Sequence, residues 1–241
     1  MNTRRAPVPL SEAGRALLTG AAVVLPNPAP LTHVVTATRA GTVNEAKGRP
    51  ARQPVALWAH HPDTLHALGH VWDLDPATAA MARWLLAEEH LTVLVPVRDP
   101  AGAPAWTAPA VKDGWMLLFG TRWEPLRPLL DAHPVLYVSS ANRTGRPPAA
   151  TTAEALAMFP DRVHVLEPAA TNPADTTPRA ATTTVRLHTD GSLELHRHGA
   201  QNRHDATPDH YLRQLRARYR RVEFQITQGQ RDPQPDQAHT A

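Results

Sequence analysis

The sequence predicts an α/β or α+β domain built around one β-sheet. Short apolar runs that suit strands alternate irregularly with longer segments whose apolar residues recur at helical spacing. The length of 241 residues fits one large domain with a small appendage, at roughly 100–200 residues per domain. With 42% hydrophobic residues, a chain of this length buries a substantial core.

Two short helices frame the first predicted strands. Residues 1–10 are expected to form a loose arm, and Ser11 to cap an amphipathic helix over residues 11–18. The apolar run at 21–25 contains a β-branched pair and ends at Pro26, which is typical of a buried strand. Further prolines then impose a rigid loop. A strand at 32–38 and a short helix at 41–46 follow.

The middle of the chain combines capped helices with buried strands. Asp63 and Asp75 each start a segment with apolar residues at helical spacing, which predicts helices over residues 63–72 and 75–89. The strands predicted from short apolar runs lie at residues 54–58, 91–95 and 115–119. A helix at 125–132 and a strand at 135–138 then lead into a polar segment.

The last part of the chain ends in a basic helix and a polar tail. A capped helix is predicted at residues 152–159, a loop at 168–180, and strands at 162–166, 182–187 and 193–196. From Pro208 a basic helix extends through Arg221. Residues from Gln228 onward contain too few apolar side chains to order themselves.

The composition excludes several classes of protein. No run approaches the roughly 20 apolar residues that cross a bilayer, and the N-terminus lacks the apolar stretch of a signal peptide, so a cytoplasmic location is expected. Without cysteine there is no disulfide scaffold, thiolate nucleophile or zinc–thiolate site. The balance of 25 basic against 22 acidic residues does not by itself indicate nucleic-acid binding.

Lysine is rare in this chain. Lys47 and Lys112 are its two lysines, whereas arginine, alanine and proline are plentiful, as in proteins encoded by GC-rich genomes. In such a background an arginine carries little information. A retained lysine carries more, so Lys47 is the first residue to examine for a function.

Two short segments have a distinct chemical character. Lys47-Gly-Arg-Pro50 places an ammonium and a guanidinium two positions apart in a tight loop, which suits phosphate oxygens. Residues 140–147, Ser-Ala-Asn-Arg-Thr-Gly-Arg-Pro, follow a strand with hydroxyl and amide groups that suit a phosphate or the edge of a nucleobase. Taken singly, the first segment is more often solvated surface and the second a simple turn.

Together, and about 90 residues apart, the two segments resemble the YrdC/TsaC family, whose members carry K-x-R followed by S-x-N. Family members make L-threonylcarbamoyladenylate from threonine, bicarbonate and ATP, release pyrophosphate, and so supply a tRNA modification. The segments that match further family positions are residues 20–26, 91–95, 181–187 and 197–200. The resemblance implies a YrdC-like domain over residues 8–200, with a twisted mixed β-sheet, flanking helices and a concave nucleotide cleft. A basic helix and tail would occupy residues 201–241.

The resemblance also implies roles for individual residues. Lys47 and Arg49 would be catalytic, because their charges bind the ATP phosphates and offset charge that grows on the departing pyrophosphate. The nucleotide would further be held by Thr92, Ser140, Asn142 and Arg197, and the second substrate by Asn27, Trp58, Val138 and Thr183. ATP is expected as a substrate with magnesium, alongside bicarbonate and threonine or an analogue. No metal-ligating residue is expected.

The amino-acid side of the site departs from the family pattern. Asn27 and Leu31 stand where the family has threonine and tyrosine, and the arginine that meets the substrate carboxylate is absent from residues 115–120. Arg122 is a candidate to replace it from a shifted loop, and Glu88 with its neighbour Glu89 would bring carboxylates toward the pocket. The pattern favours a nucleotidyltransferase. It leaves open a different acyl or amino-acid substrate, or a nucleotide- or RNA-binding protein that has lost catalysis.

Two other features permit a functional interpretation. His66 and His70 lie one helical turn apart, with Asp63 one turn earlier, which is compatible with a metal site. Chance spacing among 14 histidines explains this pattern better. The basic helix at residues 213–221 is compatible with an RNA contact, although a solvated or packed terminal helix is the simpler interpretation.

Overall fold

The computed structural model describes residues 5–99, 102–168 and 177–231. The chain divides into two compact units, residues 1–203 and 204–241. Each unit is described separately below, beginning with the larger one. Within the described ranges, no helix combines the length and the apolar character needed to cross a membrane.

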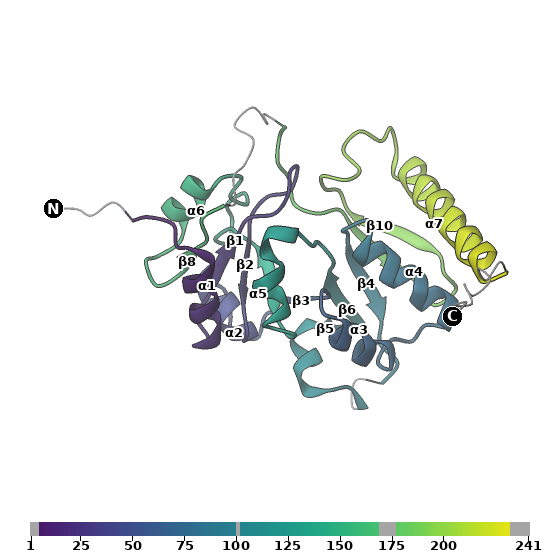
Figure 1. The fold of residues 1–241 in the computed structure, drawn as a ribbon, viewed down its shortest axis with the longest axis horizontal. Coiled ribbons are helices and arrows are strands. Elements are labelled where there is room, and N and C mark those ends of the chain that lie inside the picture. The colour runs from purple at the N-terminus through teal and green to yellow at the C-terminus, as the bar shows by residue number, and fades with distance from the viewer. Residues whose placement is uncertain (1–4, 100–101, 169–176, 232–241) are drawn as a thin grey trace, which may run out of the picture. The chain divides into compact units, whose positions relative to one another are not determined.

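The larger unit combines short helices with one large sheet (Figure 1). Its α-helices are α1 (Leu10–Leu18), α2 (Ala40–Lys47), α3 (Pro62–Gly69), α4 (Pro76–Ala87), α5 (Arg127–Asp131) and α6 (Thr152–Met158), with 3-10 helices at η2 (Ala105–Ala110) and η3 (Glu124–Leu126). Its strands are β1 (Val23–Leu25), β2 (Val34–Ala37), β3 (Ala56–Trp58), β4 (Thr92–Pro96), β5 (Val111–Lys112), β6 (Trp115–Phe119), β7 (Tyr137–Ser140), β8 (His164–Val165), β9 (Thr184–Leu187) and β10 (Leu193–Arg197).

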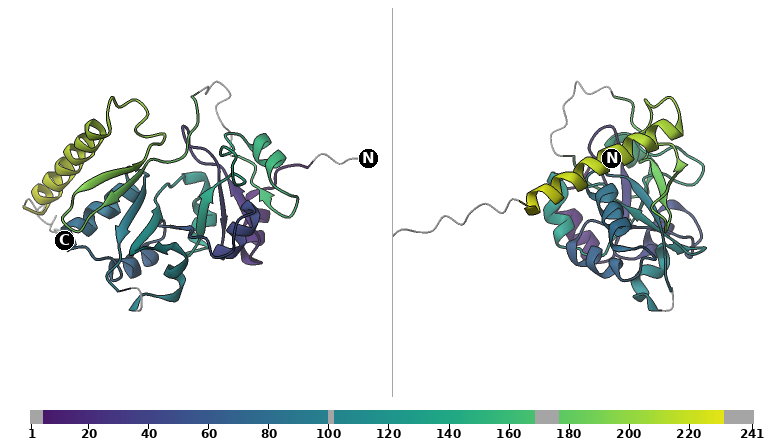
Figure 2. Two further views of the ribbon diagram at one scale, coloured as in Figure 1. Left: turned by 180° about the vertical axis from the view of Figure 1, so that it is seen from behind. Right: turned by 90° about the vertical axis from the view of Figure 1, so that its right-hand side faces the viewer.

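The described strands form a single mixed sheet of ten strands. Its order is β10-β9-β4-β6-β3-β7-β2-β1-β8, with β5 paired to β6, and it runs from one end of the unit to the other (Figures 1 and 2). The pairs β4–β9, β3–β6 and β1–β8 are parallel, whereas the other neighbours are antiparallel. The prediction of a mixed α/β fold on one large sheet flanked by helices is confirmed.

Pairing of β7 with β2 and β3 brings distant segments together at the centre of the sheet. Val34 lies opposite Ser140, and Ala56 lies opposite Val138. The turn after β7 also meets the end of α2, because the backbone N–H of Thr144 donates to the carbonyl of Lys47 at 3.3 Å. The two charged and polar segments singled out in the sequence therefore become neighbours.

The core lies where the helices cover the sheet. α1 packs on β1 and α4 packs on β4, each through its apolar face (Figure 1). One cluster joins Leu17 of α1 and Leu129 of α5 to Trp58 of β3, and all three side chains are buried. Burial of this apolar surface holds α1 and α5 against the sheet.

Several helix ends differ from the sequence-based expectation. Ser11 does not cap α1, which begins one residue earlier with Pro9 at the N-cap position. Asp75 does cap α4, because its carboxylate accepts from the N–H of Thr78 at 2.7 Å. η2 and β5 were not predicted. Prolines and glycines lie within or close to these segments, at Pro104, Pro109 and Gly114, and the residues between them show no helical or strand periodicity.

Two predicted segments, the arm at residues 1–10 and the loop at 168–180, lie only partly within the described residues. Residues 1–4 of the arm and residues 169–176 of the loop lie outside them. The prediction of a loose arm is wrong for its last part, because Val8 forms a β-bridge with Leu166. Its backbone N–H donates to the carbonyl of Val165 at 2.8 Å.

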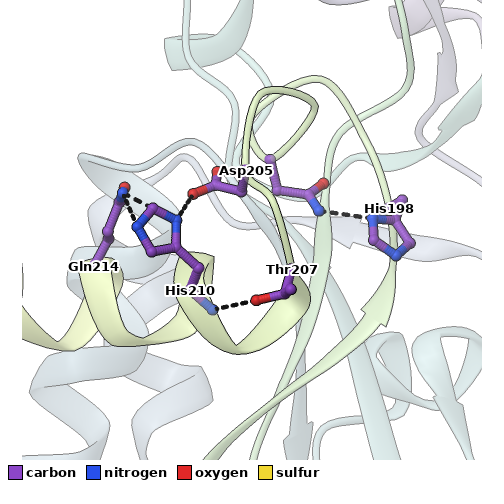
Figure 3. Close-up of polar contacts among 6 residues, drawn as sticks. His198, Asp205, Thr207, His210 and Gln214 are labelled. Atoms are coloured by element: carbon purple, nitrogen blue, oxygen red, sulfur yellow. Dashed lines mark hydrogen bonds and ion pairs between the residues drawn. The ribbon is translucent and has the colours of Figure 1, made fainter.

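The smaller unit contains one long helix, α7 (Pro208–Arg231). Its first turn is held by the hydroxyl of Thr207, which accepts from the N–H of His210 at 3.1 Å, and by a hydrogen bond between Nδ1 of His210 and Oδ1 of Asp205 at 2.9 Å (Figure 3). The predicted disorder from Gln228 is wrong for the first residues of the tail, because α7 continues to Arg231. Residues 232–241 lie outside the described residues.

Candidate active site

A cavity of about 370 Å³ opens at the centre of the sheet in the larger unit. Its floor consists of apolar side chains that alternate along the strands and therefore share one face. These side chains are Val34 of β2, Ala56 of β3, Leu117 and Phe119 of β6 and Val138 of β7. The polar wall of the cavity comes from the loop after α2, the turn after β7 and the segment before β9.

Lys47 supplies the most buried charge of this wall. It is the last residue of α2, and Gly48 ends the helix with a φ of 66°, a left-handed conformation that glycine adopts readily. The side chain is 4% exposed. Its Nζ donates to the carbonyl of Ser140 and, at 2.7 Å, to Oδ1 of Asn142. The ammonium is thus fixed between the two segments that the sequence analysis paired.

The environment of Lys47 disfavours its charged form. Burial, and to a smaller extent the neighbouring charge of Arg49, lower the pKa of Lys47 from 10.5 to about 7. The polar atoms around Nζ are neutral acceptors that do not compensate a full charge. An anion placed in the cavity would supply that compensation, which makes Lys47 a suitable phosphate ligand.

Arg49 is held in place by a buried asparagine. The side chain of Asn44, fully buried on α2, donates to the carbonyls of Ala51 and Gln53 at 2.8 Å each. Its Oδ1 accepts from Nε of Arg49. Nη2 of Arg49 is buried and has no hydrogen-bond partner among the described residues, and burial lowers the pKa of the guanidinium. A ligand oxygen in the cavity would satisfy this donor.

The turn after β7 is cross-linked by its own side chains. Oγ of Ser140 donates to Oδ1 of Asn142 at 2.6 Å, and Nδ2 of Asn142 donates to the carbonyl of Arg146 at 2.8 Å. Gly145 has a φ of 81°, which closes the turn in a conformation that few other residues adopt. Ser140 and Asn142 therefore face Lys47 from a rigid turn.

The far wall of the cavity carries a third cation. Nη2 of Arg197, on β10, donates to the carbonyl of Thr182 at 3.2 Å, and burial lowers the pKa of Arg197. The hydroxyls of Thr92 and Thr182 lie 2.6 Å apart. The sequence analysis missed Thr182, which lines the cavity. The run of threonines at residues 182–184 marks this segment, but it does not show which hydroxyl faces the ligand.

Of the four residues expected on the substrate side, two line the cavity. Val138 forms part of the floor, and Asn27 lies at the rim of the polar wall. Nδ2 of Asn27 donates to the carbonyl of Thr32 at 2.8 Å, whereas its buried Oδ1 has no partner among the described residues. Asn27 therefore offers an acceptor to a ligand that carries an N–H or O–H group.

Trp58 and Thr183 do not line this cavity, and the expectation that they contact substrate is corrected. Both side chains are fully buried. The indole N–H of Trp58 donates to the carbonyl of Thr121 at 2.8 Å. The hydroxyl of Thr183 donates to Oδ1 of Asn202 at 3.0 Å, and Nδ2 of Asn202 forms a hydrogen bond with the ring of His198 at 2.8 Å. These contacts make both residues structural.

Gly120, directly after β6, is required to be glycine by its packing. A Cβ at this position would overlap the backbone of Leu86 at the end of α4, so only glycine fits. Arg122 does not replace the missing arginine, because it lines a different cavity of the larger unit. Glu88 and Glu89 are also absent from the cleft lining. The expected carboxylates therefore do not enter the site.

The lining of the cleft is positively charged. Lys47, Arg49 and Arg197 contribute cations, and the described lining residues include no aspartate or glutamate. Among the described residues, no group of three His, Cys, Asp or Glu side chains is arranged to hold a metal ion. His66 and His70 contact each other edge to face, with ring centroids 5.2 Å apart. The cleft suits a polyanion.

Comparison with known proteins identifies related sequences and folds. The Sua5/YciO/YrdC family model, described as telomere recombination, matches residues 23–199. That match over residues 23–199 includes every described cavity-lining residue, from Asn27 to Arg197. No curated protein matches the sequence.

Solved structures share the fold at low sequence identity. Sua5 from P. abyssi, complexed with L-threonine, is 18% identical with a TM-score of 0.60, covering 79% of this chain and 54% of its own. YciO from E. coli is 13% identical with a TM-score of 0.57, covering 79% and 89%. Full-length HypF in its phosphate- and nucleotide-bound form is 14% identical with a TM-score of 0.57, covering 83% and 30%. The chain thus spans about half the length of the Sua5 structure.

Proposed function

The chain belongs to the Sua5/YciO/YrdC family, and we propose that it is an ATP-dependent nucleotidyltransferase of the threonylcarbamoyl-AMP synthase type. The single observation that carries this proposal is the contact of buried Lys47 with Ser140 and Asn142 in a cleft lined by cations. The fold it shares with HypF, whose structure contains phosphate and nucleotide, is consistent with a nucleotide in this cleft.

The three cations of the cleft are the reason that we propose ATP as the nucleotide substrate. Lys47 and Arg49 stand on one side and Arg197 on the other, so a triphosphate between them would neutralise all three charges. Nη2 of Arg49 would gain the acceptor that it lacks. Because the described lining offers no carboxylate, magnesium would enter bound to the ATP phosphates and water.

The proposed reaction needs positioning and charge stabilisation more than covalent help from the protein. The amine of the second substrate captures carbon dioxide derived from bicarbonate and forms a carbamate. A carbamate oxygen then bonds to the α-phosphorus of ATP, and the bond from that phosphorus to the bridging oxygen of pyrophosphate breaks. Lys47 and Arg49 would stabilise the charge that moves onto the departing pyrophosphate.

The second substrate would occupy the apolar half of the cleft. Its neighbours there are the floor side chains and the free acceptor Oδ1 of Asn27. Sua5 from P. abyssi binds L-threonine, which supports an amino acid in this position. β6 contributes Leu117 and Phe119 to the described lining, so threonine would meet no cationic ligand for its carboxylate from that strand. We therefore include other amino acids among the candidate substrates.

Pyrophosphate release with ATP, bicarbonate and a panel of amino acids tests this function. Release with threonine supports the threonylcarbamoyl-AMP synthase reaction and a role in tRNA modification. Release only with another amino acid supports the same chemistry on a different carbamate. Absence of release with every amino acid, while ATP still binds, contradicts the proposed enzyme and favours a nucleotide-binding protein without catalysis.

A specific feature of α7 favours RNA binding as a second candidate function. Arg213 and Arg220 are exposed about two helical turns apart, and Arg221, next to Arg220, is exposed as well. Such a stripe suits the phosphate backbone of RNA, with binding that weakens as salt increases. A chain that ends at Arg203 should lose RNA binding and keep ATP binding. RNA binding that survives this truncation would contradict a role for α7.

A further inference from the structure

A second cavity of about 340 Å³ lies between the start of α3 and α5 in the larger unit. Its lining includes His60, Pro62, Arg122, Trp123 and Leu130. The family's K-x-R and S-x-N residues contribute nothing to it, and the nucleotidyltransferase proposed above does not use it. It contains, however, two buried polar atoms that lack a partner.

The first of these atoms is Nε2 of His60. The His60 side chain is 7% exposed, and Nε2 has no hydrogen-bond partner among the described residues. His60 also makes a hydrogen bond to the backbone of His133, and because Nε2 has no partner we assign that bond, and with it the ring proton, to Nδ1. Burial and the nearby charges of His61, Arg122 and His133 lower the pKa of His60 to about 3. Nε2 therefore presents a buried lone pair that can accept a hydrogen bond from a ligand.

The second atom is Nε of Arg122. It is buried without a partner among the described residues, and Nη2 reaches the carbonyl of Ala59 only at 3.5 Å. Burial lowers the pKa of Arg122, and the charge of Glu88 opposes that shift without forming an ion pair. The guanidinium therefore carries donors that need an acceptor, preferably an anionic one.

The other charged residues that line this cavity form ion pairs with one another at its rim. Arg127 pairs with Glu124 at 3.4 Å and with Asp131 at 3.5 Å, and all three side chains are largely exposed at the rim. Their pairing leaves Arg122 as the cation, among the described lining residues, whose charge is available to a ligand. The cavity thus presents one buried acceptor and one buried cationic donor. A ligand that fits both carries a hydrogen-bond donor of its own and a negatively charged acceptor.

We propose that this cavity binds a small oxyanion that carries its own hydrogen-bond donor. The negative oxygen would pair with the guanidinium of Arg122, and the O–H or N–H group of the ligand would donate to Nε2 of His60. Glycolate is the simplest probe of this chemistry. Acetate is the matched control, because it has the same carboxylate and lacks the hydroxyl.

Trp58 separates this cavity from the nucleotide cleft. Its ring contacts Phe119, which lines the cleft, at a centroid distance of 5.3 Å, and His60 at 5.7 Å. Both contacts are edge to face, and the indole is fully buried. Trp58 therefore lies between a lining residue of each cavity, and the two cavities have no lining residue in common.

Nitrogen-15 NMR of histidine-labelled full-length protein tests the proposal. The signal of His60 is assigned from its absence in His60→Gln. Glycolate should shift the Nε2 resonance of His60 and bind about tenfold more tightly than acetate, because only glycolate satisfies the buried lone pair. Equal affinity for the two probes, or no shift with either at tens of millimolar, would overturn the proposal.

Matched variants locate the anion contact. Arg122→Gln should abolish the glycolate response, whereas Arg127→Gln at the same rim should keep it. Arg122→Lys retains the charge without Nε and should bind at least tenfold more weakly, which covers the case in which Arg122→Gln does not fold. Lys47→Ala should leave the response intact, which separates this site from the cleft. A response that persists in both Arg122 variants would contradict the assignment.

Discussion

Nζ of Lys47 lies 2.7 Å from Oδ1 of Asn142, although 95 positions separate the two residues along the chain. The contact forms because β7 pairs with β2 and because the turn after β7 bonds the backbone of Lys47. It places a cation of α2 and the polar turn after β7 on one ligand-binding wall. The proposed chemistry depends on this wall.

Removing the Lys47 ammonium should weaken ATP binding sharply. Lys47→Ala deletes a charge-assisted contact of about 1.5–3 kcal/mol, so the Kd for ATP should rise about 10- to 100-fold in isothermal titration calorimetry. Lys112→Ala is the matched control, because the side chain of Lys112 is 70% exposed and is paired with Asp113. An equal loss in both variants would mean that Lys47 has no specific role.

ATP binding should weaken as the pH rises above 7. The pKa of Lys47 is about 7 in the free protein, and phosphate contact would stabilise the ammonium and raise that pKa in the complex. The complex then holds one more proton than the free protein, so the Kd should increase about tenfold per pH unit until the pKa of the complex is reached. Calorimetry across pH 6.5–9 measures this slope. A wild-type slope no steeper than that of Lys47→Ala would contradict it.

Asn44 should be needed both for stability and for the position of Arg49. Asn44→Ala leaves the carbonyls of Ala51 and Gln53 and the Nε of Arg49 without their partner, which should lower the free energy of unfolding by about 1–3 kcal/mol. Urea denaturation measures this loss, and ATP affinity should fall as well. Glu45→Ala, which removes an exposed side chain from the neighbouring position, should change neither property by much.

Gly120 should tolerate no side chain. Gly120→Ala forces a Cβ against the backbone of Leu86 and should destabilise the protein by about 1–3 kcal/mol in thermal or urea denaturation. Gly41→Ala is the control, because its Cβ would have open space in helix α2 and should stabilise the helix by about 0.5–1 kcal/mol. If Gly120→Ala were neutral, the steric requirement for glycine at this position would be wrong.

Much of this architecture was predictable from local sequence patterns. The β-branched runs and the cap at Asp75 identified most strands and helix α4. The placement of Lys47, Ser140 and Asn142 in one cleft followed from the resemblance to the YrdC/TsaC family. The predictions of the strands and the helix depend on short-range periodicity and residue chemistry. They need no knowledge of how the strands are ordered in the sheet.

The errors arose where tertiary packing decides the direction of a side chain. Thr183 follows the lining residue Thr182 in the sequence, and Trp58 lies opposite the lining residue Phe119 in the sheet. Both side chains are nevertheless fully buried and absent from the lining. Arg122 follows a glycine that is packed against Leu86, and its side chain lines the second cavity. No local pattern distinguishes these orientations, because each depends on which element covers the strand end.

Pyrophosphate release tests the central claim most directly. Wild-type protein with ATP, bicarbonate and the amino-acid panel should release pyrophosphate with at least one amino acid. That release should require bicarbonate, should fall strongly in Lys47→Ala and should persist in Lys112→Ala. Failure of the wild-type protein to release pyrophosphate with any member of the panel, or release that Lys47→Ala leaves unchanged, would contradict the assignment of the cleft to nucleotidyl transfer.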